Sequence, residues 1–129
     1  MSGHVERIVS LFVRKEKRER ILALAGNPRR RADFRDALLH DTRSLDRSVM
    51  IAIDSRVGDA RGVFPLLHAR PTSRAYAISD LTEVDDRELV LEAALAQAFG
   101  RDRDTIVFCI DTEHAYYENH EGERFVLGR

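Results

Sequence analysis

The run Thr105–Ile110 (TIVFCI) constrains the fold of this chain more than any other stretch. It is the densest β-branched and aromatic segment of the sequence. Continuous apolarity without alternation predicts a central strand with both faces covered. Asp111 follows this strand directly. Further on, Gly122 predicts the turn of a C-terminal β-hairpin with strands over 115–119 and 123–127.

Residues 1–40 predict a helical hairpin. Apolar residues spaced i, i+3, i+4 and i+7 from Val5 to Phe12 indicate one face of a helix that we expect over 5–25. Gly26-Asn27-Pro28 combines a C-terminal glycine, an N-cap and a first-turn proline, so it ends this helix and starts another that reaches residue 40.

The remaining segments alternate between predicted strands and helices. Short apolar runs predict strands over 48–53 and 75–79, with a short helix over 63–70 between them. Asp85 and Glu88 have the spacing of a capping box, which predicts a helix over 86–99. Strands that alternate with helices favour parallel pairing through right-handed crossovers.

The predicted fold is therefore a single α/β domain over residues 1–129. A basic helical hairpin (1–40) precedes a sheet-containing part (48–129) made of a βαβαβ unit and the C-terminal β-hairpin. We expect a mixed sheet of four or five strands, with parallel strands in the βαβαβ unit.

Composition indicates a charged globular domain. Of the 129 residues, 43% are hydrophobic and 33% are charged, which excludes a disordered chain. The single cysteine, Cys109, cannot form a disulfide within one chain, so nothing indicates an oxidising compartment. No apolar run is long enough for a membrane span, and the first residues lack a secretory signal pattern. A cytoplasmic protein without membrane contact is the expectation.

Acidic residues follow each of the three strands predicted to be parallel. Asp54, Asp80 and Asp111 come directly after them, and Glu113 lies two residues beyond the last. The carboxyl ends of parallel strands meet at the edge of the sheet where ligands bind. Converging carboxylates suit Mg²⁺ and could support phosphodiester or phosphomonoester hydrolysis. We favour the simpler interpretation that these aspartates form turns and cap helices, and we keep the Mg²⁺ site as the alternative.

The C-terminal hairpin contains a second group of possible metal ligands. His114 and His120 flank its first strand, and Glu118 and Glu121 lie close to them in the sequence. Two histidines at the two ends of one strand are poorly placed to share an ion, so their spacing favours solvated hairpin residues over a transition-metal site.

Charge is distributed unevenly along the chain. Residues 1–70 contain 15 Lys+Arg against 9 Asp+Glu (+6), whereas residues 71–129 contain 6 against 13 (−7). The helical hairpin carries the candidate residues for binding a partner or a phosphate: Arg14, Lys15, Lys17, Arg18, Arg29, Arg30 and Arg31. Such a cluster suits an acidic protein surface, a second copy of the chain or, through phosphates, a nucleic acid.

The sequence contains no catalytic motif that identifies an enzyme. We expect a small binding or regulatory module that acts through a protein partner or self-association, a partner class that we favour over nucleic acid. A Mg²⁺-dependent phosphodiesterase or phosphatase and a nucleic-acid-binding protein are the alternatives. No cofactor is expected, apart from the possible Mg²⁺.

Overall fold

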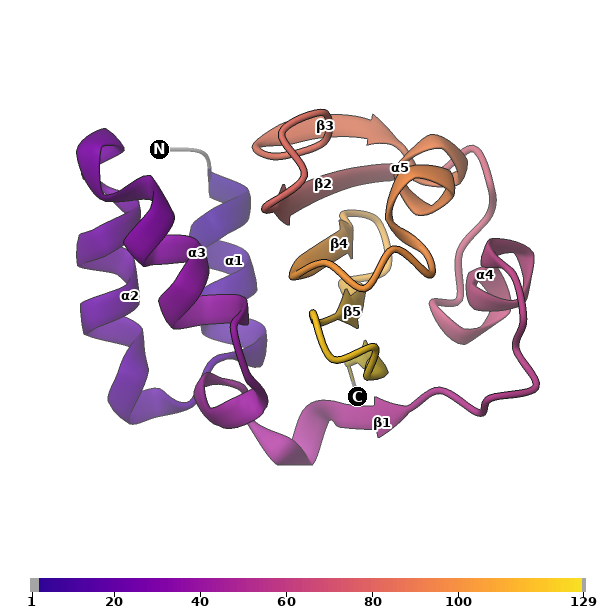
Figure 1. The fold of residues 1–129 in the computed structure, drawn as a ribbon, viewed down its shortest axis with the longest axis horizontal. Coiled ribbons are helices and arrows are strands. Elements are labelled where there is room, and N and C mark those ends of the chain that lie inside the picture. Colours follow the sequence, from indigo (N-terminus) through magenta and orange to yellow (C-terminus); the bar gives the residue numbers. More distant parts are fainter. Residues whose placement is uncertain (1–2, 129) are drawn as a thin grey trace.

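A computed structural model, which describes residues 3–128, shows three layers with a sheet between two groups of helices (Figure 1). One face of the sheet is covered by α1 (Gly3–Phe12), α2 (Arg18–Ala25) and α3 (Arg31–Leu39), and the other by α4 (Val63–Leu66) and α5 (Leu91–Ala98). The strands are β1 (Met50–Ala52), β2 (Arg74–Ser79), β3 (Arg87–Val90), β4 (Thr105–Cys109), β5 (His114–Glu118) and β6 (Arg124–Leu127). None of the described helices has the length and apolarity that a membrane crossing requires.

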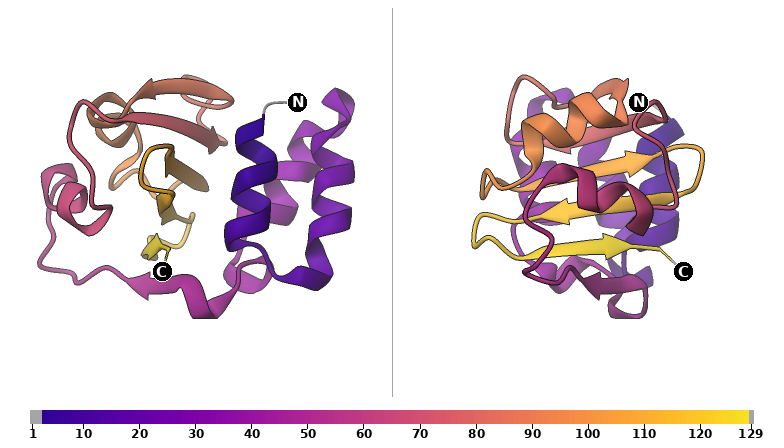
Figure 2. Two further views of the ribbon diagram at one scale, coloured as in Figure 1. Left: turned by 180° about the vertical axis from the view of Figure 1, so that it is seen from behind. Right: turned by 90° about the vertical axis from the view of Figure 1, so that its right-hand side faces the viewer.

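The sheet has six strands in the order β1-β6-β5-β4-β2-β3, and every neighbouring pair is antiparallel. The prediction of a mixed sheet of four or five strands with parallel pairing was therefore wrong. Strands do alternate with helices along the chain, and β3 and β4 on either side of α5 run in the same direction. However, β2 lies between them and pairs with both, so no parallel ladder forms (Figure 2).

The strand that the prediction did not include is β3, which lies where a helix over 86–99 was predicted. Asp85 does not cap that helix. Its carboxylate instead accepts hydrogen bonds from the main-chain N–H of Ser79 (2.9 Å) and from Arg31 (2.7 and 3.0 Å). Asp86 then turns the chain with a φ of +58°, and its N–H donates to the carbonyl of Ala77. These contacts close a β2–β3 hairpin, and the helix starts only at Leu91.

The predicted N-terminal hairpin is present in outline, but its first helix is broken. Val13 leaves α1 to form an isolated antiparallel bridge with Leu45, and both residues are fully buried. The short 3₁₀ turn Lys15–Lys17 then leads into α2. The helix ends here because burial of the apolar Val13 is more favourable than a longer helix. The charged residues that follow have no apolar face that a continued helix could bury. Asn27 caps the next turn as predicted, accepting a hydrogen bond from the N–H of Arg29.

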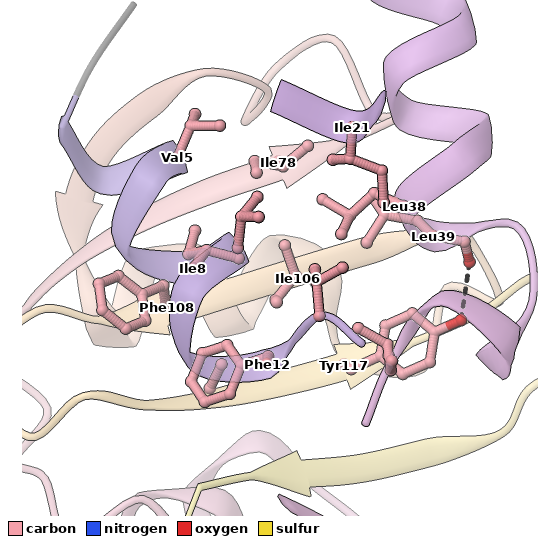
Figure 3. Close-up of a cluster of buried hydrophobic side chains, with 14 of the residues drawn as sticks. Val5, Ile8, Phe12, Ile21, Leu38, Leu39, Ile78, Ile106, Phe108 and Tyr117 are labelled. Carbon is pink, nitrogen blue, oxygen red and sulfur yellow. Dashed lines mark hydrogen bonds between the residues drawn. The ribbon is translucent and has the colours of Figure 1, made fainter. Parts of the chain in front are cut away.

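Each face of the sheet has its own core. The larger core lies between α1–α3 and the sheet, where Ile8, Phe12 and Leu38 pack against Ile106 and Phe108 (Figure 3). The alternate residues Val107 and Cys109 face the second core under α4 and α5. All five residues of β4 are buried, which confirms the prediction of a central strand covered on both faces.

Candidate metal centre

Three possible metal ligands from distant parts of the chain meet at one end of the sheet. They are His40 at the end of α3, Asp104 just before β4, and His120 just after β5. One ligand atom from each lies within 4.8 Å of the other two. The imidazole rings of His40 and His120 are stacked with their centroids 4.6 Å apart. The residues that the structure describes hold no other such group of three.

Asp104 connects the two histidines. Its Oδ1 is 3.0 Å from Nδ1 of His120 and also accepts the main-chain N–H of His120 at 2.9 Å. Its Oδ2 is 3.7 Å from Nδ1 of His40. The Asp104 side chain is only 15% exposed, while both imidazoles reach solvent. The cluster is therefore a fixed carboxylate beneath two accessible rings.

The position of His40 is set by the packing of α3 on the sheet. Tyr117 in β5 is fully buried and donates a hydrogen bond from its hydroxyl to the carbonyl of Leu39, 2.7 Å away (Figure 3). That carbonyl belongs to the last turn of α3, where helix carbonyls lack partners within the helix. The bond therefore fixes the residue immediately before His40 to the same strand that leads into His120.

The position of Asp104 is set by a buried carboxylate. Glu118 at the end of β5 accepts hydrogen bonds from the main-chain N–H groups of Gly100 (2.9 Å) and Asp102 (2.6 Å) and from the hydroxyl of Tyr116. Its Oε1 also lies 3.5 Å from Nε of Arg124. These contacts hold the loop between α5 and β4, so Asp104 enters β4 beside the end of β5.

The hairpin turn that carries His120 is itself tied together by one side chain. Asn119 is buried, and its Oδ1 accepts the N–H groups of Glu121 and Glu123. Gly122 has a φ of +80°, a conformation that glycine adopts without strain. The predicted hairpin and its turn are confirmed.

The surroundings of the cluster are acidic. Asp36 is 3.4 Å from Nδ1 of His40, one helical turn earlier in α3. The hydrogen bond that the His120 imidazole makes to the Asp104 carboxylate raises the pKa of His120 despite partial desolvation, and the charges of Glu121 and Asp80 act in the same direction. The same negative charges favour a bound cation, which must displace the proton from the imidazole nitrogen that it binds.

The four carboxylates predicted as a magnesium site do not come together. Because β2 and β4 are antiparallel and Ser79 pairs with Thr105, Asp80 lies at the beginning of β4, whereas Asp111 lies beyond its far end. Asp54 follows β1, four strands away from β2 in the sheet, which is about 19 Å at 4.8 Å per strand. The expected convergence required parallel strands.

Each of these carboxylates has local surroundings of its own. Asp54 pairs with Arg56, whose hydrogen bonds lower the pKa of the carboxyl, and it also accepts the N–H of Arg56 in a turn. Glu113 forms a two-pronged ion pair with Arg7 of α1, which lowers its pKa. Asp111 lies exposed in the turn after β4.

Asp80 is the one member of the predicted set that lies near the histidine cluster. Its N–H donates to the carbonyl of Asp104 at 3.1 Å. Its buried Oδ1 is 3.2 Å from Nε of Arg103 but accepts no hydrogen bond of good geometry. The charge of Asp80 is partly balanced by Arg103, and it still contributes to the raised pKa of His120.

Part of the predicted basic surface is engaged within the molecule. Arg31 binds Asp85 in the β2–β3 turn and lies over the ring of Phe34. Arg18 donates to the carbonyl of Val13. Other contacts join Arg14 to Glu16 and to the carbonyl of Arg43, and Arg30 to Asp33. Lys15, Lys17 and Arg29 are exposed and lie in the short 3₁₀ turns before α2 and α3.

Comparisons of the chain with protein-family models, with curated proteins and with solved structures found no match. Function must therefore follow from the site itself. Sequence reasoning considered His120 as a metal ligand but favoured a solvated hairpin residue, and it missed His40 and Asp104, which are 80 and 16 residues away from it in the chain. The available signal was that all three stand at the ends of predicted elements, where side chains from different layers can meet.

Proposed function

We propose that this protein is a binding domain for a divalent transition-metal ion, held by His40, Asp104 and His120. The observation that carries the proposal is the convergence of these three side chains, from three separate elements, with ligand atoms within 4.8 Å of one another. Two imidazoles and one carboxylate form a common donor set for zinc sites that keep further positions for water or a ligand.

The ligand chemistry supports one class of ion. Imidazole nitrogen suits Zn²⁺, Co²⁺, Ni²⁺ and Cu²⁺, whereas Mg²⁺ and Ca²⁺ prefer oxygen ligands. Zinc binds nitrogen and carboxylate oxygen at about 2.0–2.2 Å, so the donors must close in by small rotations of the side chains. Both histidines are solvent-accessible and can make such rotations, while the less exposed Asp104 provides the fixed point.

The bound ion acts as a clamp between two layers. His40 belongs to the helical layer, and Asp104 and His120 belong to the sheet. At this site, the two layers contact each other through the 3.7 Å approach of His40 to Asp104 and the stacking of the His40 and His120 rings. Metal–ligand bonds to all three residues stabilise the docked arrangement, because the unfolded chain does not keep the ligands together.

Thermal unfolding with Zn²⁺, Co²⁺ or Mg²⁺ tests this function. At one hundred times its dissociation constant, a ligand of the native state adds about 2.7 kcal/mol of stability, or roughly 10 °C for a domain of this size. We expect such a rise with Zn²⁺ and Co²⁺ but not with Mg²⁺. His40→Ala and His120→Ala should each remove most of the rise.

A second histidine pair provides the matched control. The rings of His68 and His114 are 4.9 Å apart, but they are not part of a three-ligand cluster. His68→Asn keeps a residue that tolerates the positive φ of 54° at this position. This variant should respond to Zn²⁺ like the wild type. If it loses the response while His40→Ala keeps it, the site is wrongly assigned.

A further inference from the structure

The two edges of the sheet differ sharply in how they meet solvent. The outer strand β3 carries Arg87 and Glu88, and Glu88 contacts both His4 and Arg74. Charged side chains on an edge strand discourage pairing with another chain. The opposite edge strand, β1, consists of Met50, Ile51 and Ala52, with no charge, proline or bulge to protect it.

Two of the three exposed large hydrophobic residues in the described part of the chain lie at this unprotected edge. Ile51 is 64% exposed and Leu66 of α4 is 39% exposed, while the third, Val90 in β3, is 38% exposed. Ile51 and Leu66 line one groove together with Val126 of β6. In Figure 1, β1 is the outermost strand of the sheet, and none of the labelled α-helices covers this edge.

The outer backbone groups of β1 are arranged symmetrically about Ile51. The N–H of Ile53 donates to Arg124, and the carbonyl of Val49 accepts from Gly128, so these odd-numbered residues face β6. In an antiparallel ladder the polar groups of alternate residues point to opposite sides. Met50 and Ala52 therefore direct their N–H and C=O groups away from the sheet, one on each side of Ile51.

We propose that β1 pairs with β1 of a second copy of this chain, antiparallel about a two-fold axis at Ile51. In this register Met50 of one copy exchanges hydrogen bonds with Ala52 of the other, and both such pairs form at once. The two Ile51 side chains meet on the same face of the sheet and cover the exposed apolar groove. The pairing joins two six-stranded sheets into one continuous sheet.

The position of Ile51 within β1 favours a second copy as the occupant. Its neighbours Met50 and Ala52 both direct their polar groups outward, so this edge is complementary to itself in the antiparallel direction. A closed two-fold contact of this kind uses one patch twice and stops at the dimer.

Cysteine cross-linking tests the register. Directly opposed residues that do not exchange hydrogen bonds in an antiparallel pair have Cα atoms about 4.5 Å apart, within the range for a disulfide. Mild oxidation of Ile51→Cys should therefore give a covalent dimer, whereas Val90→Cys on the charged edge and Ile53→Cys, which is out of register, should not. The native Cys109 is buried and does not compete. Equal cross-linking of Val90→Cys would overturn the proposal.

Sedimentation of the unmodified protein tests the association itself. We expect a concentration-dependent dimer for the wild type and for Val90→Lys, and a monomer with an unchanged melting temperature for Ile51→Lys. A wild-type protein that stays monomeric up to millimolar concentration would overturn the proposal. His40→Ala should still dimerise, so the result does not depend on whether the metal site exists.

Discussion

Tyr117 of β5 donates a hydrogen bond to the carbonyl of Leu39, 2.7 Å away, and so joins the end of α3 to the centre of the sheet. His40 is the next residue after Leu39, and His120 follows three residues after Tyr117. The helical layer and the sheet are thus fastened at the point where their histidines meet. Burial raises the pKa of the Tyr117 hydroxyl far above its ordinary value, so it remains a donor throughout the working pH range.

Tyr117→Phe should lower both stability and metal affinity. The carbonyl of Leu39 loses its partner in a buried place, which costs about 1–2 kcal/mol. His40 is then held less firmly, and the affinity for Zn²⁺ should fall about tenfold, as happens when outer partners of metal ligands are removed. Urea unfolding and calorimetric titration measure the two effects separately.

Tyr76→Phe is the matched control for this variant. Tyr76 also donates a hydrogen bond from its hydroxyl, in this case to Asp86 of the β2–β3 turn. The substitution should reduce stability but leave Zn²⁺ affinity unchanged, because the turn does not support the cluster. Equal losses of affinity in both variants would contradict a positioning role for Tyr117.

Glu118→Gln should destabilise the loop that carries Asp104. Glu118 is fully buried and accepts from two main-chain N–H groups, and a glutamine amide can present only one oxygen to them. Loss of a charged acceptor in a buried network should cost about 2–3 kcal/mol. Hydrogen exchange should become faster at Gly100 and Asp102, while the protection of β2 changes less. If hydrogen exchange in this loop does not change, Glu118 is not what holds the loop in place.

Protonation of Asp85 should lower the free energy of unfolding at acidic pH. Desolvation acts to raise its pKa, but the hydrogen bonds from Arg31 and Ser79 and the charges of Arg31 and Arg35 outweigh it, so the folded-state pKa lies below the ordinary 3.8. A depressed pKa contributes stability that is complete above the unfolded-state value and is lost as pH falls through the folded-state value. The loss should therefore occur below about pH 4.

The acid effect can be assigned by comparing two asparagine variants in urea unfolding between pH 2.5 and 6. Asp85→Asn should be less stable than the wild type at pH 6 and should lose less stability on acidification. Asp54→Asn removes an exposed pair with Arg56 and should behave like the wild type. An acid slope in Asp85→Asn as steep as that of the wild type would show that other carboxyls cause the effect.

The sequence predicted the features that depend on strong local signals. The apolar run of β4 and the hairpin with Gly122 at its turn were correct because burial and turn chemistry agree there. The helix predicted over 86–99 was partly wrong because Asp85 and Glu88 resemble a capping box, but Asp85 is used instead by Arg31 of α3, 54 residues away. Local pattern cannot reveal that competition.

Strand direction and the meeting of His40, Asp104 and His120 could not be predicted from the sequence. Alternation of strands with helices suggests parallel pairing, but here β2 occupies the place between β3 and β4. The antiparallel pairing of β2 with β4 also separates Asp80 from Asp111 and brings Asp80 beside Asp104. His40 meets His120 only because α3 packs across β5, a contact between layers that sequence spacing does not encode.

The most direct test of the metal site is nuclear magnetic resonance of the imidazole nitrogens during a Zn²⁺ titration. The chain has 5 histidines. We expect the resonances of His40 and His120 to shift with saturation at one equivalent, while His4, His68 and His114 remain in place. Shifts at His68 and His114, or no shift at His40 and His120, would contradict the assignment of the site.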